Sequence, residues 1–331
     1  MSATKRLRVA VVGAGFGQQV LVPVFQSLAE CEVIALTASS LEKAQRVAQV
    51  CGIRGAYGDW RKMLELERPD LVAIAAPPAV QYEIAREALT AGLPLLCEKP
   101  LALTSAQSLD LVERGLGVPA MVDFEFAETP AFQRCAELVK SGVLGQLTSI
   151  DLRWTLQTYA NLHGLESWKT RTCDGGGALF AFGSHTFYYL EWLFGPIAST
   201  GLRLSGARAG NDTQVLGDLT FASGLKATVC IDTNDPVDPT HTLRVSGRDG
   251  SLELRNSGKD HITGFTLSHI TAAARATLVE PITGPMDGRI GAVQPLAARL
   301  VRWIREGIPS HPDLTSGHRV QQLIEAVLHS Q

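Results

Sequence analysis

Apolar and polar positions follow one rhythm over the first third of the chain, where short apolar runs alternate with segments of helical spacing. The apolar runs are Leu7–Val12, Glu32–Leu36, Leu71–Ala76, Leu93–Cys97 and Pro119–Val122. Strands that are apolar along their whole length and separated by helices are typical of a parallel sheet covered on both faces. The pattern therefore predicts an α/β domain with a doubly wound parallel sheet over residues 1–123.

The pattern of apolar and polar positions changes near residues 120–128. Leu147–Leu156 alternates apolar and polar residues, as a strand with one solvated face does. Further strand-like runs lie at Ile197–Ser205, Gln214–Phe221, Leu225–Ile231 and His241–Gly247. Helical patterns lie at Pro130–Ser141, Phe180–Phe194, Gln294–Glu306 and Thr315–Leu328. This arrangement predicts an α+β domain over residues 124–331 with a large, mostly antiparallel sheet.

Turn and cap residues refine these elements. Asp59 and Thr104 each precede a helical pattern and can accept a hydrogen bond from its free amides, so both are expected to be N-caps. The small residues Ala222–Gly224 lie between two strand-like runs and predict a hairpin.

Composition narrows the class of protein. The 331 residues are 45% hydrophobic and 19% charged with a net charge of −3, which excludes a disordered chain and a basic nucleic-acid-binding surface. No apolar run approaches the ~20 residues of a membrane span, and no signal peptide is evident. The six cysteines are scattered, which indicates a reducing, cytoplasmic location. The histidines show no metal-ligand spacing, so no metal is expected.

The strongest local signal is the glycine turn after the first apolar run. Gly13 and Gly15 follow a strand and open a helix, where backbone amides can hold a pyrophosphate. The third glycine of the usual G-x-G-x-x-G pattern is missing, because Gln18 occupies its place and Gly17 lies one residue early. The turn favours a dinucleotide site, and a tight strand-to-helix turn without a nucleotide is the alternative.

The end of the second apolar run bears on which dinucleotide binds. NAD sites usually carry an acidic residue there for the ribose 2′-hydroxyl, but the segment from Ala35 to Leu41 has none. Ser39, Ser40 and Lys43 are suited to a 2′-phosphate, so NADP is preferred over NAD. Alternatively, the serines only cap the helix that begins at Leu41.

Lys99 lies directly after the fourth apolar run, in Cys97-Glu98-Lys99-Pro100. Ligands of a doubly wound sheet bind beyond the carboxyl ends of its strands, so Lys99 is expected to face the nicotinamide. A cis peptide between Lys99 and Pro100 is a hypothesis for how the side chain is aimed. A solvated charge at the end of a strand is the alternative interpretation.

Several motifs in order resemble those of the Gfo/Idh/MocA family of nicotinamide-dependent oxidoreductases. They are GAGFG, Ala76-Pro77-Pro78, CEKPLAL, Gly142–Gly145, Gly175–Leu179 with Gly183-Ser184-His185, and Trp192–Gly195. Together with the last helix, the resemblance covers essentially the whole chain. It implies an N-terminal Rossmann domain and an enzyme that oxidises or reduces a secondary alcohol or ketone carbon, often of a sugar or cyclitol.

The resemblance also implies roles for individual residues. Those expected at the cofactor are Gly13, Gly15, Phe16, Gly17, Ala76, Pro77, Glu98 and Lys99. Lys99 would also hydrogen-bond the substrate oxygen, and His185 would be the general acid or base. Lys99 and His185, although distant in sequence, are expected to converge on one small molecule.

The chain departs from the family pattern at several residues of the expected substrate site. Ala181 and Tyr188 replace two aspartates, and Gln81 replaces a common histidine. Tyr188 keeps a hydroxyl and is a further catalytic candidate, although an ordinary phenol is a poor base at neutral pH. The segment Asp123–Ala127 lacks a common arginine and is expected to continue as a strand, with Asp123 and Glu125 facing out of the sheet.

Two alternatives to a dehydrogenase stay open, and these departures motivate the first of them. One is an NAD(P)-binding sensor or regulatory protein without turnover, and another is a glycoside-processing enzyme that recycles its nicotinamide within each cycle. The aromatic helix Phe180–Phe194 is expected to pack in the core, or else to stack on a cyclic substrate. The resemblance implies a homodimer or homotetramer formed through the C-terminal sheet.

Overall fold

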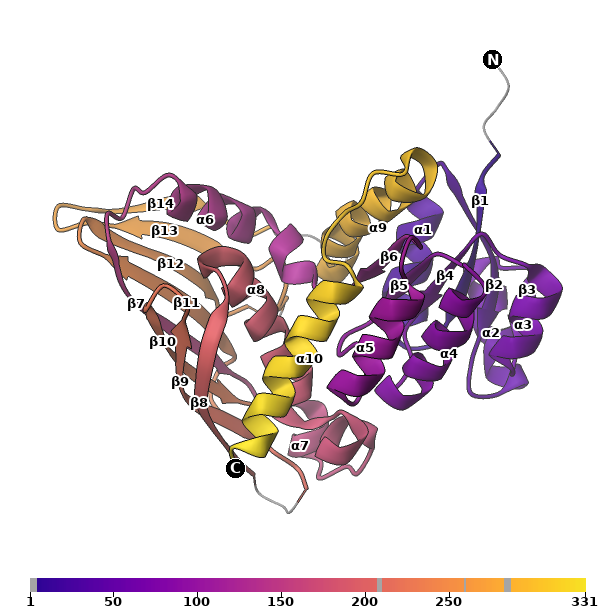
Figure 1. Cartoon of the computed structure of the whole chain (residues 1–331), viewed down its shortest axis with the longest axis horizontal. Coiled ribbons are helices and arrows are strands. Elements are labelled where there is room, and N and C mark those ends of the chain that lie inside the picture. The colour runs from indigo at the N-terminus through magenta and orange to yellow at the C-terminus, as the bar shows by residue number, and fades with distance from the viewer. Residues whose placement is uncertain (1–4, 207–209, 259, 283–286) are drawn as a thin grey trace. The chain divides into compact units, whose positions relative to one another are not determined.

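The chain folds into two compact units (Figure 1). The structure is a computed structural model that describes residues 5–206, 210–258, 260–282 and 287–331. The first unit comprises Met1–Asp123 and Arg289–Arg319, and the second comprises Phe124–Gly288 and Val320–Gln331. Each unit is built around its own sheet.

The first unit contains a parallel sheet with six strands among the described residues, in the order β3-β2-β1-β4-β5-β6. The strands are β1 (Leu7–Val12), β2 (Cys31–Thr37), β3 (Gly55–Tyr57), β4 (Leu71–Ile74), β5 (Leu95–Cys97) and β6 (Ala120–Val122). All neighbouring pairs are parallel. This confirms the predicted doubly wound sheet, whose strand order reverses between β1 and β4, where such sheets bind ligands.

Helices connect the strands of this sheet. They are a π-helical turn (Gly17–Leu21) that continues into α1 (Val22–Ser27), α2 (Leu41–Cys51), α3 (Trp60–Glu67), α4 (Pro78–Thr90) and α5 (Ser105–Arg114). Asp59 and Thr104 cap α3 and α5 as predicted, each accepting a backbone N–H of the first turn. These caps satisfy amides that have no partner within the helix.

Helix α9 (Gly288–Glu306) supplies part of the core of the first unit, although it comes late in the sequence. Val293, Leu296 and Leu300 are fully buried in one apolar cluster with Val9 and Phe25. The sequence analysis placed this helix in the second domain, because its amphipathic pattern shows that one face is buried but not which sheet buries it. The last helix, α10 (Leu314–His329), begins in the first unit and ends in the second.

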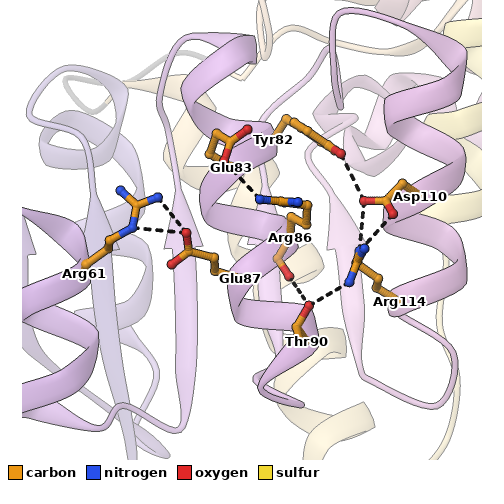
Figure 2. A network of polar contacts seen from close by, with 8 residues as sticks. All are labelled: Arg61, Tyr82, Glu83, Arg86, Glu87, Thr90, Asp110 and Arg114. Atoms are coloured by element: carbon orange, nitrogen blue, oxygen red, sulfur yellow. Dashed lines mark hydrogen bonds and ion pairs between the residues drawn. The ribbon is translucent and has the colours of Figure 1, made fainter.

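Polar side chains join α3, α4 and α5 on the side away from the sheet (Figure 2). Arg61 pairs with Glu87 at 2.6 Å, and the Tyr82 hydroxyl lies 3.1 Å from a carboxylate oxygen of Asp110. The hydrogen bond from Arg114 holds the pKa of Asp110 below its usual range. These are mostly surface contacts, which individually add little stability.

The second unit contains a sheet with eight strands among the described residues, in the order β14-β13-β12-β11-β7-β10-β9-β8. The strands are β7 (Leu147–Thr155), β8 (Ile197–Ser205), β9 (Gln214–Phe221), β10 (Lys226–Asp232), β11 (Thr240–Gly247), β12 (Gly250–Asn256), β13 (Thr266–Ile270) and β14 (Arg275–Val279). All neighbouring pairs are antiparallel except β7 with β10. The predicted mostly antiparallel sheet and the β9–β10 hairpin are confirmed.

One face of this sheet is covered by helices. Strand β10 buries Ala227, Val229 and Ile231 and leaves the residues between them at or near the surface. Helix α6 (Pro130–Lys140) packs on β12, β13 and β14. Four shorter helical segments lie between β7 and α8 (Ser184–Phe194) among the described residues: α7 (Tyr159–Leu162), two turns of 3-10 helix (Trp168–Thr170 and Thr172–Asp174) and a π-helical turn (Leu179–Gly183).

The segment after Asp123 differs from the expected strand. Glu125–Glu128 forms a turn of 3-10 helix, and the side chains of Asp123 and Glu125 are only 1% and 5% exposed. The expectation that these two acids face out of a sheet was wrong. The alternation of acidic and aromatic residues imitates a strand, but Phe124 and Phe126 are buried in the aromatic core of the second unit together with their neighbours.

Candidate active site

The glycine turn at the carboxyl end of β1 has a separate physical reason for each glycine. Gly13 has φ +112°, and a Cβ there would collide with the backbone carbonyl of Ala75. A Cβ on Gly17 would lie 3.1 Å from Val11 Cγ1, so Gly17 allows the helix to pack closely on β1. Gly17 thereby performs the packing role of the third glycine of the usual motif, one residue early.

Gly15 tests whether this turn fits a dinucleotide. A Cβ added to Gly15 would meet no atom within 4 Å, so no contact inside the protein requires glycine there. A glycine at a surface turn that opens a helix lets a phosphate approach the backbone amides. The residues present therefore fit a pyrophosphate beside Gly15, with Phe16 and Gly17 as the next residues of the helix.

The end of β2 presents small polar residues. Ser40 is the N-cap of α2 and accepts the backbone N–H of Lys43 at 3.2 Å, which confirms the capping role. Ser39, Ser40 and Lys43 are all exposed, and the first acidic residue after β2 is Glu42. The end of β2 thus presents hydroxyl groups and a cation and lacks the carboxylate that NAD sites usually carry there.

Lys99 lies in the segment that follows β5. The Lys99–Pro100 peptide bond is cis, in agreement with the hypothesis from the sequence. The backbone N–H of Glu98 donates to the Ile74 carbonyl at 3.0 Å, which continues the β4–β5 pairing up to Lys99. The Lys99 backbone N–H donates to the Glu98 carboxylate at 3.2 Å.

These segments meet at one edge of the first sheet. The turn at Gly13–Gly17, the serines after β2, Ala76 and Pro77 after β4, and Lys99 after β5 all follow the carboxyl ends of parallel strands. Parallel strands end at the same edge, so the sheet brings the predicted cofactor residues together there.

His185 lies in the first turn of α8, in the second unit. Its side chain is 5% exposed, and its ring meets those of Phe126 and Phe124 edge to face at centroid distances of 5.0 and 6.3 Å. Tyr188, one turn further on, stacks flat on Phe124 at 4.3 Å and is half-buried. His185 and Tyr188 therefore share one aromatic wall, and neither lies in the unit that contains Lys99.

A buried carboxylate, Asp212, fixes the start of the helical segment that carries His185. Its Oδ2 accepts the backbone N–H of Leu179 at 2.7 Å, and its Oδ1 accepts the Thr172 hydroxyl at 2.6 Å. A Cβ on Gly177, which has φ +82°, would collide with this carboxylate. Burial raises the pKa of Asp212. The sequence analysis missed Asp212, because it acts on a residue 33 positions away.

His241 is a second imidazole in the aromatic core. It stacks on Trp154 at a centroid distance of 4.0 Å, and its Nε2 lies 3.1 Å from the Tyr189 hydroxyl. Burial lowers the pKa of His241 to about 3, with a smaller contribution from His261. His241 is therefore neutral at physiological pH.

Among the residues that the structure describes, no group of three or more His, Cys, Asp or Glu side chains is placed to hold a metal ion. None of their helices combines the length and the apolar character needed to cross a bilayer.

Two family profiles match this chain. Residues 7–124 match an oxidoreductase family described as having an NAD-binding Rossmann fold, and residues 132–253 match the GFO/IDH/MocA C-terminal domain. The two matches cover the sheet of the first unit and much of the sheet of the second.

Individual proteins are similar over nearly the full length. An uncharacterized oxidoreductase of Synechocystis sp. is 33% identical over 98% of this chain and 94% of its own. A D-xylose 1-dehydrogenase (NADP(+)) of Haloferax volcanii is 25% identical over 96% of this chain and 94% of its own. A solved levoglucosan dehydrogenase in complex with NADH has a TM-score of 0.87 at 21% identity, covering 98% of this chain and 97% of that chain, which shows a shared fold.

Proposed function

Because this chain belongs to the Gfo/Idh/MocA family of NAD-binding oxidoreductases, we propose that it transfers a hydride between a nicotinamide and a secondary alcohol or ketone carbon of a sugar, cyclitol or related small molecule. The observation that carries the proposal is the placement of Lys99 at the sheet edge that also carries the Gly13–Gly17 turn. A relative whose name specifies D-xylose supports the class of substrate.

In this proposal the chain's own residues position the substrate and manage charge and protons. The nicotinamide of the bound cofactor supplies or accepts the hydride. Lys99 donates a hydrogen bond to the substrate oxygen and stabilises the negative charge that develops there. His185 takes or returns the hydroxyl proton of the same substrate, and Tyr188 is a second hydroxyl donor one helical turn away.

The proposed cofactor preference is for NADP over NAD. A carboxylate at the end of β2 would repel a 2′-phosphate, and here the chain presents Ser39, Ser40 and Lys43. The family is NAD-binding, and one relative is named for NADP(+). The ratio of kcat/KM for the two cofactors measures this preference, and a ratio that favours NAD contradicts it.

Two other functions are alternatives, and the first, a sensor, is motivated by Ala181 and Tyr188, which replace acidic residues of the family pattern. A sensor would bind NADP(H) but turn over no member of a broad panel of sugars, polyols and ketones. An enzyme that recycles its nicotinamide within each cycle would be purified with the cofactor bound and would consume glycosides without net NADPH formation.

We also propose that copies of the chain associate through the outer face of the eight-stranded sheet. That face carries alternating residues such as Asp151, Arg153, Thr228 and Arg244, which are exposed in the isolated chain. An assembly of two or four copies in sedimentation experiments, weakened by charge reversal at Arg153 and Arg244, is the expected result.

The decisive experiment concerns Lys99. The Lys99→Ala variant is expected to bind NADP(H) nearly as well as the wild type and to lose ~100-fold or more in kcat on any panel compound that is turned over, because the alkoxide loses its stabilising cation. Lys62→Ala, at an exposed lysine of the same unit, is the matched control. Wild-type turnover by Lys99→Ala would remove Lys99 from the mechanism.

A further inference from the structure

The backbone on both sides of Lys99 accepts hydrogen bonds from the side chain of a glutamine on α4, Gln81. Gln81 is 1% exposed. Its Nε2 donates to the backbone carbonyls of Glu98 at 2.6 Å and Pro100 at 3.0 Å, and lies 3.3 Å from the carbonyl of Leu101. One amide nitrogen therefore donates hydrogen bonds to the backbone carbonyls on both sides of Lys99.

The environment fixes which end of the Gln81 amide faces this segment. Carbonyl oxygens only accept hydrogen bonds, so the reversed amide would place Oε1 against three other acceptors. With Nε2 toward the carbonyls, Oε1 is buried and has no hydrogen-bond partner among the described residues. The side chain thus leaves its own acceptor unsatisfied while it satisfies the backbone around Lys99.

We infer that Gln81 is a positioning residue for Lys99: it fixes the backbone before and after the lysine and so determines where the ammonium group lies. The inference rests on the proposed function, in which that ammonium donates to the substrate oxygen. Gln81 itself touches neither substrate nor cofactor in this account. A lysine side chain is long and flexible, so fixing its backbone limits the positions from which it can act.

The alternative is that Gln81 only attaches α4 to the rest of the unit. However, α4 also buries Ile84, Ala85, Ala88 and Leu89 against the core. These contacts anchor the helix without Gln81, so the loss of its side chain amide is expected to loosen the Lys99 segment while α4 stays in place.

A double-mutant cycle separates these two roles. The variants are Gln81→Met, which keeps the length of the side chain but cannot donate, Lys99→Ala, and the combination, with D-xylose and levoglucosan as probe substrates. Gln81→Met is expected to lower kcat ~10- to 100-fold with the Kd for NADPH changed less than ~2-fold, because the reacting groups are misplaced by a fraction of an ångström. In the Lys99→Ala background it is expected to have no further effect.

Two matched variants complete the test. Gln81→His retains an N–H donor and is expected to recover part of the lost kcat. Tyr82→Phe, which removes a hydrogen bond from the outer side of the same helix, is the control and should keep wild-type kcat. Equal losses from Gln81→Met with and without Lys99 would overturn the positioning role. If Lys99→Ala alone is fully active, the proposed function fails first.

A measurement without substrate keeps the inference testable. Hydrogen exchange of the wild type and of Gln81→Glu is compared for peptides that span residues 97–103 and for α4. The ionised carboxylate of the variant cannot donate and would face the three carbonyls, so exchange over 97–103 is expected to increase at neutral pH. On acidification this carboxyl group gains a proton and can donate again, so the excess exchange over the wild type should shrink. Unchanged exchange over 97–103 in this variant would overturn the inference.

Discussion

Acid should destabilise the second unit through the buried imidazole of His241. This side chain stacks on Trp154 and hydrogen-bonds Tyr189 in a closed aromatic environment, where a charged ring would lack solvation. Its pKa is lowered from the ordinary 6.5 to about 3, mainly by burial. The unfolded chain therefore takes up this proton at a higher pH than the folded chain does.

The sign and magnitude follow from that difference. Since the folded pKa is depressed, the stability linked to neutral His241 is fully present above pH ~6.5 and is lost as the pH falls toward ~3. Each pH unit in this window costs ~1.4 kcal/mol, so this single group lowers the free energy of unfolding by ~2 kcal/mol at pH 5 and by ~5 kcal/mol at most.

Urea unfolding of the wild type and of His241→Gln between pH 7.5 and 4.5 measures this effect. The variant is expected to be less stable at pH 7.5, because it loses the stacking on Trp154, but its stability should fall less steeply on acidification. His163→Gln, at an exposed histidine, is the matched control. Parallel pH profiles for the wild type and His241→Gln would refute the reasoning, because every other titrating group is common to both.

Two further substitutions test the glycine turn and the buried carboxylate. Gly13→Ala is expected to destabilise the chain by more than ~2 kcal/mol and to abolish NADPH binding, because the added methyl group meets rigid backbone. Gly52→Ala, with open space around the added methyl group, should cost only ~1 kcal/mol for its left-handed φ. Thermal melts measure the stability and NADPH fluorescence measures the binding of both variants, and equal losses would contradict the steric argument. Asp212→Ala is expected to lower the free energy of unfolding in urea by ~2–4 kcal/mol, because the Leu179 N–H loses its buried acceptor. Asp218→Ala, at an exposed acid, should lower it by less than ~1 kcal/mol. Similar values for both variants would show that Asp212 does not fix the helix start.

The sequence predicted the elements whose signals are local. The caps at Ser40, Asp59 and Thr104 and the β9–β10 hairpin depend on neighbouring residues, and all are confirmed. The five strands predicted in the first domain are present, although the ends of several differ by one or two residues. The cofactor residues could be grouped because parallel strands must end at one edge of the sheet. Strands β3, β12, β13 and β14 were not predicted. Strand β14 buries almost nothing and so has no apolar alternation.

Features that depend on distant contacts could not be predicted in this way. The 3-10 turn after Asp123 has the alternation of a strand, yet Glu125 is buried and Phe126 packs among the aromatic rings of the second unit. Gln81 is polar in an amphipathic helix, and its partners are the carbonyls of another loop. No local pattern in the sequence distinguishes such a residue from one that faces solvent.

Helix α9 belongs to the core of the first unit although it follows most of the second unit in the sequence. Residues 124–288 are therefore an insertion into the first unit. The chain leaves the nucleotide-binding half after β6 and returns to it at Arg289. An N-terminal fragment ending at Asp123 would therefore expose the apolar surface that Val293, Leu296 and Leu300 cover, and we expect it to aggregate. A chimera of two relatives should therefore exchange only the inserted segment, and the two sequence segments that form the nucleotide-binding half should come from one parent.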